Sequence, residues 1–108
     1  MALSYTHAFQ RQLKRLARKY RRIRADIEPI LEQIEAGEMP GDQVTGIGAT
    51  VFKVRAPNRD AQRGSSGGYR MIYYMQTSDE IVLLTIYSKT EQGDISATEL
   101  QTILQEIE

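Results

Sequence analysis

Residues 69–89 read YRMIYYMQTSDEIVLLTIYSK, and the fold is built around this stretch. β-Branched and aromatic residues, which favour strands, fill residues 69–76 and 80–89. The short polar segment 77–79 between them predicts a turn, so the two strands should form an antiparallel hairpin. Just upstream, residues 50–55 alternate with a period of two, which predicts a third, half-buried strand.

The N-terminal part of the chain has the pattern of helices. Apolar residues recur every three or four positions across residues 9–34, which predicts helical structure with one apolar face. Pro29 lacks an amide hydrogen and disfavours helical geometry at the residue before it. We therefore expect a helical hairpin or a sharp kink between Tyr20 and Pro29, with Gly37 just beyond the end of the helix. Four glycines and a proline in residues 37–49 predict a loop.

The C-terminal segment carries the signals of a short helix. Ser96 and Glu99 form a capping box, and Ile95 and Leu100 occupy the two positions of a hydrophobic staple. Apolar residues then follow at helical spacing: Leu100, Ile103, Leu104 and Ile107. Residues 1–108 are thus expected to form a single α+β domain, in which an N-terminal helical hairpin packs on a small antiparallel sheet and a short C-terminal helix follows. We expect the helices on one face of that sheet.

The amino-acid composition excludes several classes of function. The chain has 108 residues, 41% hydrophobic and 26% charged, and a formal net charge of zero, which excludes a uniformly basic nucleic-acid binder. Cysteine is absent and His7 is the one histidine, which excludes a disulfide scaffold, a thiolate metal site and a two-histidine catalytic pair. No apolar run approaches the roughly 20 residues that span a bilayer, and residues 1–10 lack the apolar core of a signal peptide. We expect a cytoplasmic protein that needs no metal or other cofactor.

The zero net charge hides strong segregation along the chain. Residues 1–24 carry eight basic residues and no acidic one, whereas residues 25–42 carry six acidic residues and no basic one. Most of the N-terminal cations fall on the helix face opposite the apolar one: Arg11, Lys14, Arg15, Arg18, Arg21 and Arg22. This basic strip fits the backbone of an RNA, and it equally fits a solvated helix face.

Basic residues also gather on the predicted strands. Lys53 and Arg55 share one strand face, Arg70 begins the next strand, and Tyr87 and Lys89 share a face at the end of the last one. If the strand register brings them together, the cations suit a phosphodiester, because they bind phosphate and stabilise charge in its transition state. A phenol or ammonium whose pKa is lowered by neighbouring cations would move the proton of a ribose 2′-hydroxyl. Solvated strand faces are the competing interpretation.

Two segments resemble the RelE/HigB branch of the RelE/ParE toxin superfamily. They are TVFKVRAPNRDAQRGSSGGYRMIYYM at residues 50–75 and IVLLTIYSKTEQGDIS at residues 81–96. The resemblance extends over residues 50–108 and, more loosely, over residues 5–46. It implies a small α+β fold and the toxin role in a type II toxin–antitoxin pair. RelE-like members cut mRNA in the ribosomal A site without metal, by attack of a ribose 2′-hydroxyl on the adjacent phosphate.

The resemblance also implies roles for residues of this chain. Arg70 and Lys89 match catalytic positions of the family, and Tyr87 lies near a position where several members carry a histidine or a tyrosine. The implied roles are that Arg70 clamps the phosphate and that Tyr87 or Lys89 assists proton transfer. The implied RNA- or phosphate-binding residues are Lys53, Arg55, Arg59 and Arg63. The implied ribosome-binding residues are Arg11, Lys14, Arg15, Arg18 and Arg22. The implied partners are a cognate antitoxin protein, the ribosome and mRNA, with no membrane and no small-molecule cofactor.

The chain departs from the family pattern at several points. RelE has an arginine where this chain has Thr90, and a tyrosine near the helix start where this chain has Ser96. The N-terminal strand typical of the fold has only residues 3–5 to form it, and the net charge is zero. Thr90 and the net charge of zero favour one alternative to an endonuclease, a non-catalytic ParE-like toxin that inhibits a protein target such as gyrase. A third interpretation is an inactivated toxin-like domain that only binds partners, and the presence of Lys53, Arg55 and Arg70 together argues against it.

Overall fold

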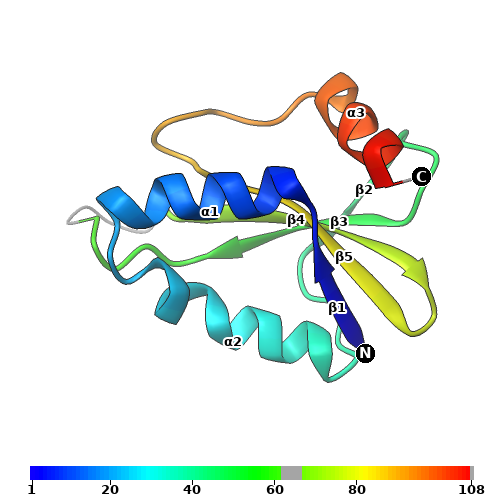
Figure 1. The fold of residues 1–108 in the computed structure, drawn as a ribbon, viewed down its shortest axis with the longest axis horizontal. Coiled ribbons are helices and arrows are strands. Elements are labelled where there is room, and N and C mark those ends of the chain that lie inside the picture. The colour runs from blue at the N-terminus through cyan, green and yellow to red at the C-terminus, as the bar shows by residue number, and fades with distance from the viewer. Residues whose placement is uncertain (62–66, 108) are drawn as a thin grey trace.

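The computed structural model describes residues 1–61 and 67–107 and shows a five-stranded sheet between two helical layers (Figure 1). Its elements are, in chain order, β1 (Ala2–Tyr5), α1 (His7–Lys19), α2 (Ile23–Glu35), β2 (Asp42–Val44), β3 (Val51–Ala56), β4 (Tyr69–Thr77), β5 (Glu80–Ser88) and α3 (Ala97–Ile107). The strand order across the sheet is β1-β5-β4-β3-β2. The predicted α+β class, with a helical hairpin and a short C-terminal helix, is therefore confirmed.

The prediction of a purely antiparallel sheet was wrong at one edge. β1 pairs in parallel with the first half of β5, while the remaining neighbours are antiparallel. Thr6 follows β1 and ties it to α1. The Thr6 hydroxyl accepts a hydrogen bond from the Phe9 amide at 3.0 Å, which caps the helix, and donates to the Leu84 carbonyl at 2.7 Å. A strand of four residues gives too short a pattern for its pairing to be read from sequence.

The break between α1 and α2 falls inside the predicted interval, but Pro29 does not cause it. α1 ends at Lys19, and Tyr20 closes it by donating its amide to the Leu16 carbonyl at 2.8 Å. α2 then continues through Pro29 to Glu35. The prediction for Gly37 is confirmed. Gly37 has a φ of +98°, and the amides of residues 37 and 38 bond back to the carbonyls of residues 34 and 33, as in a Schellman motif.

The loop predicted for residues 37–49 contains a short edge strand. β2 pairs with the start of β3, so the prediction of a continuous loop was wrong there. Gly41, just before β2, has a φ of +95°, and a Cβ at this position would lie 2.3 Å from the Lys53 carbonyl oxygen. Only glycine fits so close to the neighbouring strand.

The two faces of the sheet carry different cores. On one face, side chains of α1 and α2 pack against alternate residues of β3, β4 and β5, including the buried Tyr69, Met71 and Tyr73. On the other face, Leu100 of α3 packs against a second cluster that includes Val51. The helices therefore cover both faces, and the prediction that they share one face was wrong. The strands in the middle of the sheet carry buried apolar residues on both faces. The alternation of apolar and polar residues in β3 therefore could not predict which face α3 covers.

The third helix is anchored at its beginning more firmly than along its length. The predicted capping box is present, since the Glu99 amide donates to the Ser96 hydroxyl at 3.1 Å. Leu100 is buried, whereas Ile103, Leu104 and Ile107 are only half-buried.

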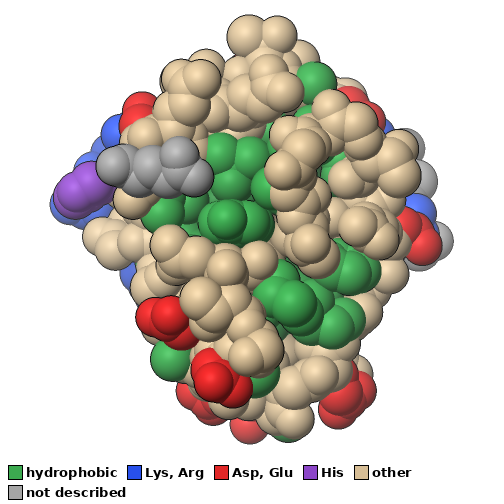
Figure 2. All heavy atoms as spheres, turned by 90° about the vertical axis from the view of Figure 1, so that its right-hand side faces the viewer, with side chains coloured by type: hydrophobic (Ala, Val, Ile, Leu, Met, Phe, Trp, Pro, Cys, Tyr) green, Lys and Arg blue, Asp and Glu red, His purple; other side chains and the backbone are tan. Residues whose placement is uncertain are grey.

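At the end of the molecule where the C-terminus lies, apolar side chains are visible in the surface hollows, and lysine and arginine appear only at the margins (Figure 2).

A bulge in β5 determines which side chains face α3. Ile72 pairs with Thr85, but the next residue, Tyr73, pairs with Leu83, so β5 contains one extra residue at position 84. An extra residue shifts the alternation of every following side chain to the opposite face. Tyr87 therefore lies on the α3 face of the sheet.

Within the described residues, no helix is long and apolar enough to cross a membrane.

Candidate functional site

Three side chains form a row across the α3 face of the sheet. Arg55 of β3 pairs with Arg70 of β4, and Arg70 pairs in turn with Tyr87 of β5. Lys53 lies two residues along β3, on the same face as Arg55. The structure thus brings Lys53, Arg55, Arg70 and Tyr87 to one face of the sheet, which is the register on which the candidate site depended. We call these four residues, three cations and the phenol of Tyr87, the cationic row.

Arg70 is the most enclosed cation of the row. Its side chain is buried, with only 9% of the residue exposed, and Nη1 donates to the carbonyls of Gly67 and Tyr69 at 3.4 and 3.3 Å. Gly68, just before β4, has a φ of +59°, and a Cβ there would lie 2.8 Å from the Ala56 carbonyl oxygen, so glycine is required where the chain passes beside β3. The guanidinium is held by backbone dipoles, and it forms no ion pair among the described residues.

Tyr87 is buried, and its hydroxyl donates a hydrogen bond to Asp94 at 2.9 Å. Burial, reinforced by this bond to a carboxylate, raises the pKa of the Tyr87 phenol, and the nearby Arg70 opposes the shift only in part. The expectation that neighbouring cations lower the pKa of this phenol was therefore wrong. Tyr87 keeps its proton at neutral pH and acts in the structure as a hydrogen-bond donor.

Asp94 is the residue that sequence reasoning missed. Its Oδ1 accepts from the Ile95 amide at 2.8 Å, and both carboxylate oxygens lie 3.4 Å from the Lys53 ammonium. The Ile95 amide, the Tyr87 hydroxyl and Lys53 hold the pKa of the Asp94 carboxyl below its usual range. Asp94 lies in the connection between β5 and α3, and its link to Lys53, 41 residues earlier, depends on tertiary structure alone.

Lys89 lies just beyond β5 and does not join the hydrogen bonds of the cationic row. Its ammonium donates to the Gly93 carbonyl, and its amide donates to the Gly68 carbonyl at 3.0 Å. The second contact fixes the end of β5 beside the start of β4. Lys89 is half-buried, so its ammonium stays near the surface at the end of the row.

Several of the other predicted cations are held in ion pairs. Arg59 pairs with the buried carboxylate of Asp26 on α2, and Arg22 pairs with Asp60 at 3.7 Å. Arg15 pairs with Glu91 at 3.0 Å. The remaining predicted ribosome-binding residues are exposed and form no ion pair within the described part of the chain: Arg11, Lys14 and Arg18. Arg63 lies outside the described residues.

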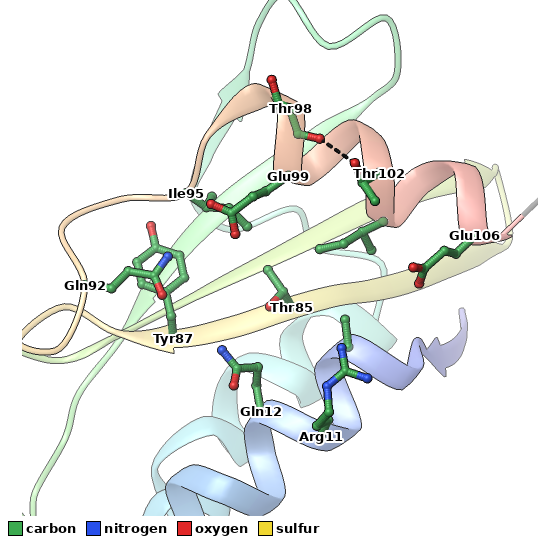
Figure 3. Close-up of a pocket in the computed structure, with 12 residues that line it drawn as sticks. Arg11, Gln12, Thr85, Tyr87, Gln92, Ile95, Thr98, Glu99, Thr102 and Glu106 are labelled. Atoms are coloured by element: carbon green, nitrogen blue, oxygen red, sulfur yellow. Dashed lines mark hydrogen bonds between the residues drawn. The ribbon is translucent and has the colours of Figure 1, made fainter.

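A polar groove of about 450 Å³ opens beside the cationic row (Figure 3). α1 forms one wall and α3 the other, and β5 forms the floor with Thr85 and Tyr87. Gln12 reaches in from α1, and Gln92 lies next to the Tyr87 ring. Side chains that donate and accept hydrogen bonds thus line a space that leads to the Tyr87 phenol.

The fold and the row define a class of protein: a small α+β domain with a helical hairpin on one sheet face and a buried arginine, a phenol and further cations on the other. Comparison with protein-family models identifies the class more closely. Residues 7–107 match the family described as the RelE toxin of the RelE / RelB toxin-antitoxin system. The chain therefore belongs to the RelE toxin family, as the resemblance implied. It is a toxin of a toxin–antitoxin system, and an antitoxin is its partner.

Proposed function

We propose that this toxin is a ribosome-dependent mRNA endonuclease of the cytoplasm that inhibits translation. The observation that carries the proposal is the cationic row, in which the strand register sets Arg55, Arg70 and Tyr87 side by side. Cations fixed on a rigid sheet are suited to a phosphate whose charge grows in the transition state. The family assignment supports the toxin role, and the cationic row supports cleavage at a phosphate.

The reaction that fits these side chains is attack by a ribose 2′-hydroxyl on the adjacent phosphate, without a metal. The 2′-oxygen–phosphorus bond forms while the bond from phosphorus to the 5′-oxygen breaks, giving a 2′,3′-cyclic phosphate and a free 5′-hydroxyl. Arg70 stabilises the phosphate charge, and Lys53 and Arg55 position it. Tyr87 and Lys89 serve the two proton transfers, one from the attacking oxygen and one to the leaving oxygen.

The surroundings of the row supply substrate contacts. A nucleotide next to the scissile phosphate fits the polar groove, which has Tyr87 in its floor. The exposed cations Arg11, Lys14 and Arg18 on α1 provide a surface for ribosomal RNA. Arg11 lines the groove as well as belonging to this surface, so the ribosome contact and the substrate groove adjoin.

A non-catalytic toxin that inhibits a protein such as gyrase is the second candidate. One observation favours it. The hydroxyl of Thr90, which stands where RelE has an arginine, lies 2.9 Å from the hydroxyl of Ser88 at the end of β5, and Thr90 brings no charge to the site. The cationic row would then bind acidic groups of a protein target.

Sequencing the 5′ ends of mRNA after induced expression separates the candidates. Cuts that fall within translated codons and are absent from untranslated RNA would support the ribosome-dependent endonuclease. DNA breaks with intact mRNA would support the protein-directed toxin, and absence of toxicity would indicate an inactivated domain. Expression of Arg70→Ala in parallel is the matched control, because it removes one cation of the row.

A further inference from the structure

We propose that Asp94 is a positioning residue for catalysis, and that it acts through Tyr87 as a proton relay. The inference rests on the proposed endonuclease function. In the relay, the 2′-hydroxyl proton passes to the Tyr87 oxygen while the phenolic proton of Tyr87 passes to an Asp94 carboxylate oxygen. The electron pair left on the 2′-oxygen forms the new bond to phosphorus, and the pair of the broken bond leaves on the 5′-oxygen, which takes a proton from the Lys89 ammonium.

The geometry of the pair fits this transfer. The Tyr87 hydroxyl and Asp94 Oδ1 lie 2.9 Å apart, within hydrogen-bond distance, and Tyr87 is the donor, since a carboxylate carries no proton to give. Asp94 Oδ1 is fixed by the Ile95 amide at 2.8 Å. Tyr87 also lines the groove. In the proposed relay, a nucleotide bound there brings its 2′-hydroxyl to the phenol oxygen, while the phenolic hydrogen points to Asp94.

The relay explains how a buried phenol works as a base. Burial keeps Tyr87 protonated, so a phenolate is not available to accept the 2′-hydroxyl proton. In a relay the phenol gains one proton as it loses another, and no phenolate forms. Asp94 changes charge instead, because its carboxylate takes up the proton and becomes a neutral carboxylic acid. The charged groups around the pair are Lys53 from β3 and Arg70 from β4, and Glu99 of α3 lines the same groove.

The connection that carries Asp94 is held to the body of the protein at a second point. Glu91 pairs with Arg15 at 3.0 Å and with Lys19 at 3.4 Å, both on α1. Glu91 forms no hydrogen bond with Tyr87 among the described residues. Replacing Glu91 therefore loosens the connection without changing the proton acceptor of the phenol, which makes Glu91→Gln a matched control for Asp94→Asn.

The test is single-turnover cleavage of a defined mRNA on programmed ribosomes, with the full-length protein. Asp94→Asn keeps an oxygen that accepts from Tyr87 and Ile95 but removes the basic site, and its side chain is 60% exposed, so the fold should survive. We expect the rate to fall about 100-fold or more, with unchanged ribosome affinity. Asp94→Glu should restore part of the rate, and Glu91→Gln should stay near wild type.

Two further readouts distinguish a relay from simple support of the fold. Tyr87→Phe combined with Asp94→Asn should be no slower than Tyr87→Phe alone, because both changes break one relay. In mixtures of light and heavy water, the wild-type rate should show the two relay protons in transfer in addition to the Lys89 proton, and Asp94→Asn should show fewer protons than the wild type. Multiplying effects in the double variant, or a full rate for Asp94→Asn, would overturn the relay. A wild type that cuts no mRNA would instead refute the endonuclease itself, and the relay with it.

Discussion

The ion pair between Asp26 and Arg59 should stabilise the fold, and its removal gives a sharp test of what Arg59 does. The Asp26 carboxylate is fully buried, and it accepts from Arg59 Nε at 2.5 Å and from the Arg59 amide at 3.0 Å. Arg59→Ala leaves this carboxylate buried with the one amide as its remaining donor among the described residues. The pair also holds the segment after β3 against α2, so the change affects how that segment is placed.

The expected loss follows from the burial of the two partners. Removing one member of a fully buried ion pair costs about 3 to 5 kcal/mol, because the other charge is left without compensation. The Arg59 side chain is itself 58% exposed, so water reaches the vacated position and offsets about half of that cost. We therefore expect a loss of about 2 kcal/mol, or a fall in Tm of about 8 °C for a domain of this size.

Thermal unfolding followed by circular dichroism measures this loss. Asp26→Asn should cost a similar amount, and the double variant should lose about 2 kcal/mol rather than the sum, because both changes break one pair. The salt dependence of ribosome affinity tests the alternative, in which Arg59 binds RNA. An Arg59→Ala protein with unchanged Tm and a salt slope reduced by about 0.7 would refute the structural role and support a phosphate contact.

Three further predictions concern the toxin surface. Arg70→Ala should slow single-turnover cleavage by about 30- to 1000-fold, or about 2 to 4 kcal/mol, and a full rate in the folded variant would exclude Arg70 from catalysis. Reversing the charges of Arg11, Lys14 and Arg18 should lower the salt slope of ribosome affinity by about 0.7 to 0.9 per lost contact, whereas an unchanged slope would indicate a solvated face. Hydrogen exchange should show that an acidic antitoxin segment protects β3 and the end of β5, and protection confined to the helical hairpin would contradict that docking.

Local signals predicted most of the fold, and interactions distant in sequence account for what was missed. The hairpin of β4 and β5, the capping box at Ser96 and the glycine at Gly37 depend on neighbouring residues, and each is present. β1 and β2 have only four and three residues, which is too short for a periodic pattern in the sequence. These strands form because they pair with the longer strands β5 and β3. The face covered by α3 depends on packing that no single strand reveals.

The cationic row could be predicted only in part, because its assembly depends on a bulge. Strict alternation from Val82 through Leu84 would place Tyr87 on the opposite face from those two residues, away from Arg70. The extra residue at position 84 reverses this and sets Tyr87 beside Arg70. Asp94 gives no local signal at all, because an acidic residue before a helix is common and its contact with Lys53 appears only when the chain is folded.

The neutral net charge is compatible with the proposed RNA-cutting surface because the charges are unevenly distributed over the folded chain. Asp26, Asp60 and Glu91 pair with arginines or a lysine that hold loops to helices. Within the described residues, Arg55 and Arg70 keep no carboxylate partner, and the exposed cations of α1 lie across the groove from α3. The proposed RNA path therefore has cations at both ends, on the α1 surface and at Arg55 and Arg70, while the α3 wall of the groove between them carries Glu99 and Glu106. Total charge is the wrong quantity for judging such a protein, because what an RNA meets is the set of cations that folding leaves unpaired.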